Sequence, residues 1–466
     1  MRPGLSTQVF TPDDTIVAVA TPPGRGSVGV VRISGPRAIA LAGTLLDRTE
    51  DLTPRHATFG RIVDGGHGAT PSGIDQVVAT FFPQPGSYTG EDVVELSAHG
   101  SPVLLDRIVS LVLVHGGRLA EPGEFTLRAF LHGRLDLLQA EAVADLVDAV
   151  TPLQARVAFD QLEGTMTGRI AEADRELLDL IARLEASLDF PEEGYHFIES
   201  GEVVRAVGKI VARVRALLSG AGTGRLIREG CQVVILGKPN VGKSTLFNHL
   251  VGSNRAIVAP EAGTTRDLIT EVIDLDGLAV TLIDTAGLRS AEGNIEAEGV
   301  SRARQAIGVA AAAIVVFDQS QALEAQDRAV LEETTTTPRV VVFNKVDRPL
   351  NWLSESLLLG QQGVSVGVSA LTGDGTRRLR EKLREVLVGA DALRDTPMVA
   401  NTRHIDLLER AAAALEDAER AAKQVAAEEF VLADLDRARI ALEELTGKRT
   451  PDDVLRHIFE RFCIGK

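Results

Sequence analysis

The sequence predicts a multidomain protein in which an N-terminal α+β domain precedes a helical domain that is interrupted by an inserted α/β domain. The chain has 466 residues, a length that corresponds to about three domains. Its first 120 residues alternate β-like runs with Gly/Pro turns, whereas Leu/Ala/Glu/Arg-rich runs follow from about residue 125 and return from about 401 to 460. Between the helical stretches, apolar strands alternate with helices, which indicates a mostly parallel sheet.

The N-terminal domain is expected at residues 1–128. Examples of its β-like runs are "TIVAVA" (15–20), "VGVVRIS" (28–34) and "QVVATFF" (76–82), and the run "SPVLLDRIVSLVLVHGG" (101–117) predicts a helix.

The helical domain is expected at residues 129–228 together with 389–466. In "LLDLIARLEASL" (177–188), apolar residues recur every three or four positions on one helical face. The domain between its two parts is expected at residues 229–388, an insertion that is tolerated because the termini of a domain often lie close together.

The inserted domain contains five predicted strand segments. The segment 271–284 should form a hairpin, because Asp276 and Gly277 stand at its centre and Asp-Gly favours a tight β-turn. The five segments are "QVVILG" (232–237), "EVIDLDGLAVTLID" (271–284), "AAAIVVFD" (311–318), "RVVVFNK" (339–345) and "VSVGVSA" (364–370).

Composition excludes several classes of protein. The formal net charge is −16, so RNA contacts would need a local basic patch or a partner. Two cysteines rule out a disulfide framework and fit a reducing compartment. No signal-like N-terminus and no apolar run of the ~18–20 residues that span a bilayer is present, so we expect a cytoplasmic protein without a membrane segment. The terminal "CIGK" is a poor prenylation box, since Gly465 is not aliphatic and Lys466 is not a usual last residue.

The stretch "GKPNVGKS" (237–244) matches a P-loop between a predicted strand and a predicted helix. Glycines allow backbone N–H groups to surround phosphates, Lys243 can neutralise the β/γ oxygens, and Ser244 can ligate Mg²⁺.

Four further motifs follow in order, and we expect each of the five elements at the carboxyl end of a strand. "AGTTRD" (262–267) offers Thr265 as a second hydroxyl for Mg²⁺, and "DTAG" (284–287) offers an acid and a glycine near the γ-phosphate. In "NKVD" (344–347), Asp347 can accept from guanine N1–H and N2–H₂, and "SAL" (369–371) can direct a backbone N–H to O6. The set predicts a Ras-like GTP-binding domain.

The hydrolytic apparatus differs from that of Ras, where a Gln follows the DTAG glycine. Leu288 occupies that position here and cannot orient water. Asn240 supplies an oxygen beside the phosphates, where a monovalent cation could counter the transition-state charge. Three acids after DTAG could position water, and the residues alone do not choose between Glu292, Glu296 and Glu298.

Taken together, these residues resemble the tRNA-modification GTPase family known as MnmE or TrmE. The resemblance covers essentially the whole chain. Related GTPases of ribosome assembly share the P-loop and "AGTTRD", so the N-terminal blocks and the Cys tail separate the families. The blocks are "DTIVAVATPPGRGSVGVVRISGP" (14–36), "SYTGEDVVELSAHG" (87–100), "EPGEFTLRAFLHGRLDLLQAEAVADLVDA" (121–149) and the terminal "CIGK".

The resemblance implies an N-terminal domain that dimerises and binds a one-carbon tetrahydrofolate, either 5-formyl- or 5,10-methylene-tetrahydrofolate. It implies a homodimer that works with the FAD-dependent partner MnmG, as a heterotetramer, on C5 of wobble uridine 34 of certain tRNAs. The product carries an aminomethyl or carboxymethylaminomethyl group. GTP hydrolysis would depend on K⁺ and on dimerisation of the GTPase domains.

The resemblance also assigns residues by motif. Glu296 aligns with the catalytic glutamate, and K⁺ would be held by Asn240 and by the loop residues Ala259, Glu261 and Thr264, largely through backbone carbonyls. The folate contacts align with Arg32, Glu95, Arg134 and Lys466. The family usually has Lys at the position of Arg134, and the planar guanidinium of arginine donates hydrogen bonds in a different geometry from the compact ammonium of lysine. The GTP site would comprise Asn240, Val241, Gly242, Lys243, Ser244, Thr245, Ala259, Pro260, Glu261, Ala262, Gly263, Thr264, Thr265, Asp284, Thr285, Ala286, Gly287, Asn344, Lys345, Asp347, Ser369, Ala370 and Leu371.

Cys463 in the terminal tail has two interpretations. In the related family the Cys faces the folate and tRNA chemistry, where a thiolate could add to C6 of uracil and raise nucleophilicity at C5. Alternatively, the tail orders the site through contacts. Cys231, at the start of a strand, is expected to be a small buried apolar residue.

Other functions are weaker. "GRGSVG" (24–29) matches a dinucleotide-binding pattern, but it lies between two predicted strands and lacks a partner acid ~20 residues later. Five histidines, among them His99 and His132, lack metal-ligand spacing. A GTP-dependent switch acting on ribosomal RNA would explain the GTPase motifs but not the N-terminal blocks. A folate-sensing scaffold without catalysis would explain Leu288 but not the complete motif set.

Overall fold

The computed structural model describes residues 14–64, 72–189, 200–254, 269–285, 305–350, 364–389, 399–424 and 427–466. The chain divides into two compact units, of which the first is Met1–Ala144 with Glu443–Lys466 and the second is Asp145–Leu442. Each unit is described by itself.

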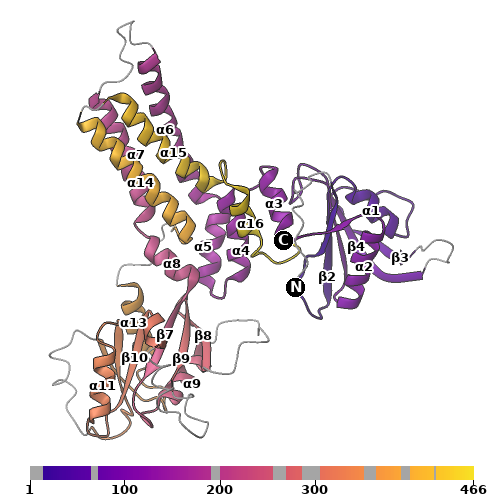
Figure 1. Ribbon diagram of the computed structural model, residues 1–466. Coiled ribbons are helices and arrows are strands. Elements are labelled where there is room, and N and C mark those ends of the chain that lie inside the picture. Colours follow the sequence, from indigo (N-terminus) through magenta and orange to yellow (C-terminus); the bar gives the residue numbers. More distant parts are fainter. Residues whose placement is uncertain are drawn as a thin grey trace, which may run out of the picture. The chain divides into compact units, whose positions relative to one another are not determined.

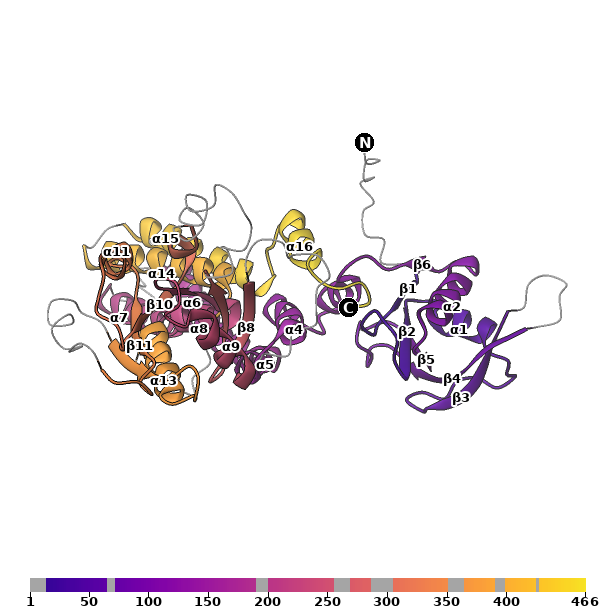
Figure 2. The ribbon, with the colours of Figure 1, turned by 90° about the horizontal axis from the view of Figure 1, so that it is seen from below.

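The first unit is built on a six-stranded sheet with the order β3-β4-β5-β2-β1-β6. Neighbouring strands are antiparallel except β1 and β6, which are parallel. Two helices, α1 and α2, cover one face (Figure 2). The bounds are β1 (Ile16–Val19), β2 (Val28–Ser34), α1 (Ala38–Leu45), β3 (Thr58–Asp64), β4 (Ser72–Phe82), β5 (Val93–His99), α2 (Pro102–Val114) and β6 (Arg118–Leu119).

The two faces of this sheet differ because side chains alternate along a strand. In β2, Val31 and Ile33 are fully buried in the core shared with α1 and α2, whereas Arg32 points to the opposite face. That opposite face carries the exposed Phe59 and Val78.

Short helices continue the first unit: α3 (Glu124–Leu131), the first part of α4 (Leu137–Asp148) and α16 (Asp452–Phe459). A small core joins them through Leu127, Leu137 and Phe459. After α16 the terminal tail returns to the sheet, where Ile464 pairs with Pro122 in an antiparallel bridge.

The second unit contains a group of long helices, visible in Figure 1 around α6, α7, α14 and α15. Helices α7 and α14 pack along one another although they lie far apart in sequence. The bounds are α5 (Pro152–Leu162), α6 (Thr165–Asp189), α7 (Ser200–Leu218), α8 (Ala221–Glu229), α14 (Thr402–Lys423) and α15 (Glu428–Thr446), of which the part from Glu443 on belongs to the first unit.

The inserted domain carries the second sheet, with the order β12-β11-β10-β7-β9-β8. All neighbours are parallel except β8 and β9, which form a hairpin. Apolar strand residues face α9 and α13 on one side and α11 on the other. The bounds are β7 (Cys231–Leu236), α9 (Lys243–Asn254), β8 (Ile269–Leu275), β9 (Leu278–Asp284), β10 (Ala312–Asp318), α11 (Ala325–Glu333), β11 (Arg339–Asn344), β12 (Val364–Val368) and α13 (Thr376–Val388).

The predicted architecture is confirmed: an N-terminal domain of helices and strands, and a helical domain interrupted by a Ras-like P-loop domain. The hairpin at Asp276–Gly277 is confirmed as well. The expectation that "AGTTRD" (262–267) lies at the carboxyl end of a strand falls outside the described residues. Since β8 is antiparallel, its first residue, Ile269, pairs with Asp284 and so begins at the carboxyl edge of the other strands.

Candidate functional site

The P-loop connects the end of β7 to the first turn of α9. Gly237 has φ +148° and Gly242 has φ +98°. A Cβ on Gly237 would lie 2.4 Å from the Val316 carbonyl oxygen, and one on Gly242 would lie 2.3 Å from Asn344 Nδ2. Both positions therefore require glycine, and the loop closes tightly against β10 and β11.

Lys243 is buried within this loop. Its Nζ donates to the carbonyl oxygens of Gly237 and Lys238, both at 2.9 Å. The ammonium is thus held inside the loop at the N-terminus of α9, where backbone N–H groups and the helix dipole favour a phosphate.

The predicted base-reading residues are joined to the P-loop by hydrogen bonds. Asn344 donates through Nδ2 to the Val241 carbonyl at 2.7 Å and accepts through Oδ1 from the Ala370 N–H at 2.9 Å. The amide of Asn344 therefore fixes the distance between the phosphate loop and the "SAL" segment.

Asp347 lies exposed beside these residues. Ser369 Oγ donates to its carboxylate at 2.6 Å, and this hydrogen bond holds the pKa of Asp347 below its ordinary value. An ionised carboxylate only accepts hydrogen bonds, as reading of guanine N1–H and N2–H₂ requires.

Lys345 contacts the P-loop from β11. Its Nζ donates to the Asn240 carbonyl at 2.9 Å and forms an ion pair with Asp318 at 2.6 Å. Burial raises the pKa of Asp318, but hydrogen bonds from Lys345 and Ser320 outweigh it, so the pKa lies below its ordinary value. Sequence reasoning missed Asp318, although its place at the end of β10, beside the "NKVD" strand, was a usable signal.

Asp284 is the last residue of β9, and Thr285 follows it. Asp284 is fully buried, and Thr285 Oγ1 donates to the Ile235 carbonyl at 2.8 Å. The remaining predicted residues of this site lie outside the described residues: Ala259, Pro260, Glu261, Ala262, Gly263, Thr264, Thr265, Ala286, Gly287 and Glu296, as do Glu292, Glu298 and Leu288.

The predicted folate residues define a second site, on the sheet of the first unit. Arg32 Nε and Glu95 Oε1 form an ion pair at 2.9 Å between neighbouring strands. The Arg32 guanidinium lies 5.1 Å from the ring centroid of Tyr88 and 5.6 Å from that of Phe125. Tyr88 in turn shares a hydrogen bond of 2.8 Å with Thr126, and burial raises the pKa of its phenol. Sequence reasoning missed both rings, because their role comes from tertiary packing.

The terminal tail reaches this site. Arg32 Nη1 donates to the Gly465 carbonyl at 3.3 Å, and Gly123 N–H donates to the Cys463 carbonyl at 3.5 Å. Gly465 has φ +101°, and a Cβ there would lie 2.2 Å from the Val19 carbonyl oxygen. The tail backbone is therefore held against β1, whereas the side chain of Cys463 is exposed.

The other two predicted folate residues lie near this site. Arg134 follows α3, and its Cγ would be 3.4 Å from a Cβ on Gly90, two residues after Tyr88. The N–H of Lys466 donates to the Cys463 carbonyl at 3.3 Å. Cys231 is half-buried against the core of the inserted domain, and burial raises its pKa to about 11.

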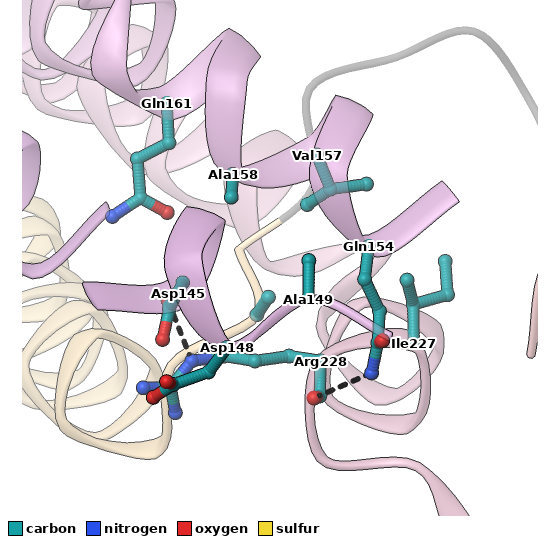
Figure 3. A pocket seen from close by; sticks show the side chains of 10 residues that line it. Asp145, Asp148, Ala149, Gln154, Val157, Ala158, Gln161, Ile227 and Arg228 are labelled. Carbon is teal, nitrogen blue, oxygen red and sulfur yellow. Dashed lines mark hydrogen bonds and ion pairs between the residues drawn. The ribbon is translucent and has the colours of Figure 1, made fainter. Parts of the chain in front are cut away.

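A small pocket of about 60 Å³ lies in the second unit between α5 and α8 (Figure 3). Arg228 Nε forms an ion pair with Asp145 at 2.7 Å, and Gln154 Nε2 donates to the Arg228 carbonyl at 3.1 Å. This volume is enough for about two water molecules and too small for a nucleotide or a folate.

Within the described ranges, no helix is long and apolar enough to cross a membrane.

The inserted domain thus has the features of a guanine-nucleotide-binding P-loop domain: a closed phosphate loop with its buried lysine, an acid at the end of β9, and Asn344 and Asp347 at the base-reading edge. The sequence model of a protein family, described as "GTP-binding protein TrmE N-terminus", matches residues 15–134. A model described as "MnmE helical domain" matches residues 137–463.

Relatives match over nearly the full chain. The tRNA modification GTPase MnmE of Koribacter versatilis is 41% identical over 458 residues, covering 97% of this chain and 99% of its own length. The tRNA modification GTPase MnmE of Thiobacillus denitrificans is 43% identical over 460 residues, which cover 97% of this chain and 98% of its own length. The chain therefore belongs to the MnmE family of tRNA modification GTPases.

Solved structures match over shorter stretches. A crystal structure of Aquifex aeolicus Era is 26% identical, with a TM-score of 0.28, and covers 41% of this chain and 66% of that one. The G domain of the FeoB iron transporter from T. maritima is 26% identical, with a TM-score of 0.27, and covers 34% and 98%.

Proposed function

We propose that this GTPase, with the FAD-dependent partner MnmG, adds an aminomethyl or carboxymethylaminomethyl group to C5 of wobble uridine 34 of certain tRNAs. One observation carries this proposal. The tail that bears the exposed Cys463 is attached directly beside the Arg32–Glu95 pair, so a nucleophile and a ligand site lie together. A GTP-dependent assembly switch has no need of that arrangement.

The residues around Arg32 fit a reduced folate. A pterin ring presents adjacent N–H donors that a carboxylate such as Glu95 can accept, and it is flat enough to lie against aromatic side chains such as Tyr88. The folate would be 5-formyl- or 5,10-methylene-tetrahydrofolate, and it would supply the one-carbon unit. Arg134 and Lys466 are proposed as further contacts.

The thiol of Cys463 is proposed to activate the base. Its sulfur would form a bond to C6 of uracil while the C5–C6 π pair moves toward the C4 carbonyl, which makes C5 nucleophilic. C5 would then bond to the one-carbon unit of a methylene-tetrahydrofolate, and an amine would replace the folate nitrogen on that carbon, so that tetrahydrofolate leaves. Loss of the C5 proton and departure of the sulfur would restore the ring and the free thiolate. A tail that only orders the site is the other interpretation of Cys463.

GTP is proposed to bind through Lys243 and Ser244. Mg²⁺ would be held by Ser244 and Thr265, and K⁺ by Asn240 with the loop residues Ala259, Glu261 and Thr264. Bound K⁺ would supply positive charge where phosphate charge develops, and Glu296 would position water. The exposed hydroxyl of Ser244 at the start of α9 and the exposed Asn240 suit these two roles.

The assembly is proposed to be a cytoplasmic homodimer, activated by association of its GTPase domains and combined with MnmG into a heterotetramer. The expected domain boundaries, 1–128, 129–228 with 389–466, and 229–388, remain predictions.

Mass analysis of tRNA tests the proposal. A strain lacking this gene should lose the C5 modification of wobble uridine, and the wild-type chain should restore it. If uridine 34 is unchanged in the deletion strain while ribosome assembly fails, the chain is an assembly switch.

Complementation with Cys463→Ser separates the two interpretations of the tail. Serine keeps nearly the same size and hydrogen bonding, but its hydroxyl is a far weaker nucleophile. We expect little or no uridine modification, with GTP hydrolysis by the purified variant unchanged. Normal modification in this variant would leave Cys463 only an ordering role.

A further inference from the structure

The open face of the N-terminal sheet continues well beyond the Arg32–Glu95 pair. The strand register places three rows of side chains across this face, each row two residues further along the strands. The first row is Arg32, Glu95 and Thr80; the second is Val30, Ser97, Val78 and Phe59; the third is Val28, His99, Gln76 and Arg61.

The second row is apolar on its outer side. Val78 and Phe59 are direct cross-strand partners, and they are 39% and 69% exposed. Two such neighbouring side chains form an apolar surface against which a flat ring can pack. This surface is one row, ~7 Å along the strands, from the row of Glu95.

The third row ends in a cation. Arg61 lines a pocket of about 410 Å³ together with Gly73, Gln76 and His99. In the part of the chain that the structure describes, Arg61 has no ion-pair partner, and the neighbouring segment 65–71 contains no acidic residue. A Cβ on Gly73 would lie 3.3 Å from Arg61 Cδ, so the glycine leaves room for the stem of the arginine.

Asp75 lines the same pocket, and its carboxylate accepts hydrogen bonds from the backbone N–H and the ring of His99. His99 Nδ1 and Asp75 Oδ1 form a pair at 2.7 Å. Burial raises the pKa of Asp75, but hydrogen bonds from the His99 N–H and ring outweigh it and hold that pKa below its ordinary value. Arg61 is the only arginine or lysine of the third row, and no carboxylate among the described residues forms an ion pair with it.

We propose that this face is the subsite for the aminobenzoyl-glutamate arm of the folate. The ring lies on Val78 and Phe59, and Arg61 binds the carboxylates of the glutamate, including the added γ-linked residues of an oligoglutamate. This inference rests on the folate proposed above. The order of groups in the ligand, a polar bicycle, an aromatic ring and carboxylates, matches the order of the three rows. The third row lies four residues further along β5 than Glu95, a distance of ~13 Å. Arg61 is on β3, two strands away from β5, and neighbouring strands are ~4.8 Å apart.

Calorimetric titration of the full-length protein tests this subsite, with 5-formyl-tetrahydrofolate carrying one or three glutamates. The wild-type protein should bind the triglutamate about three- to tenfold more tightly, the gain expected of one or two charge-assisted contacts at a partly exposed site. Arg61→Gln should reduce this gain to less than about twofold. Raising the salt concentration should also reduce it, because the contact is exposed.

A matched control is Arg37→Gln, which removes another exposed arginine from the same unit. Arg37 donates to the carbonyls of His115 and Gly116 at the end of α2, on the face that the helices cover. It should keep the full triglutamate gain.

The outcomes separate the two proposals. If the wild-type protein binds neither folate, the folate proposal itself fails. If it binds both with equal affinity, or if Arg61→Gln retains the gain, folate binding stands and the Arg61 subsite is overturned.

Discussion

Asn240 shows how one residue of the P-loop serves two requirements. Its backbone has φ +64°, a region where Asn is enriched among non-glycine residues. Its carbonyl accepts from Lys345, which leaves its exposed side-chain amide available to a ligand. The backbone conformation and the proposed K⁺ contact can therefore be separated by mutation.

Hydrolysis of GTP should be faster in K⁺ than in Na⁺, and Asn240→Gly should remove this difference. Glycine accepts the positive φ without strain, so GTP affinity should stay within about threefold. Asn240→Ala removes the same oxygen but adds strain of about 1 kcal/mol, so its GTP affinity should be lower than that of the glycine variant. Initial rates in the two salts check this, and equal rates for the wild-type protein would contradict a K⁺ site.

Residues that the backbone itself demands were predictable from the sequence. The P-loop glycines, Lys243 and Asp347 belong to fixed spacings that bring their groups to one edge of a sheet. Tyr88 and Phe125 were not predictable, because they contact Arg32 only after three separate segments have packed together.

At the scale of elements, strands buried on both faces were easier to predict than half-exposed ones. In β10 and β11 every residue is buried, which gives continuous apolar runs. Strands β3 and β5 were not among the β-like runs that the sequence singled out, because β3 contains Gly60 and two charged residues and β5 alternates apolar with polar residues. Helix α1 was missed because it is only 8 residues long.

The terminal tail is an element whose position depends on one glycine. Gly465→Ala would strain a backbone with φ +101° and place a methyl group 2.2 Å from the Val19 carbonyl oxygen. The tail should therefore leave β1 and the Arg32 guanidinium. We expect uridine modification to fall by tenfold or more, folate affinity to fall, and GTP hydrolysis to be unchanged.

Alkylation of Cys463 and calorimetry with folate measure this release. Gly389→Ala is the control, since Gly389 also has positive φ, +79°, but an added Cβ would meet no atom within 4 Å. If Gly465→Ala retains wild-type folate affinity and modification, the tail does not complete the site.

At the scale of the whole molecule, the GTPase motifs and the tail lie in different units. If GTP hydrolysis drives the proposed uridine modification, the inserted domain needs a structural connection to the helical domain. One contact within the second unit suits this role. Thr151 Oγ1 donates to the Gly277 carbonyl at 2.7 Å at the turn between β8 and β9. In the sequence, "AGTTRD" comes just before β8 and "DTAG" begins at the last residue of β9, so both motifs adjoin the end of the hairpin opposite Gly277.

Leu153→Ala tests this connection, because Leu153 packs from α5 onto the core of the inserted domain and against Gly277. The side chain is only partly buried, so its loss should cost about 1–2 kcal/mol of folding free energy, less than the loss of a fully buried leucine side chain.

We expect GTP hydrolysis by the purified Leu153→Ala protein to stay within about twofold of wild type, since none of the described phosphate or base contacts involves α5. Uridine modification in cells should fall severalfold, because movement of the hairpin is no longer passed to α5. Leu178→Ala, at a leucine of α6 that is 45% exposed, is the matched control and should affect neither activity. Equal losses of both activities in Leu153→Ala would mean that the contact only stabilises the fold, and wild-type modification would mean that the signal takes another path.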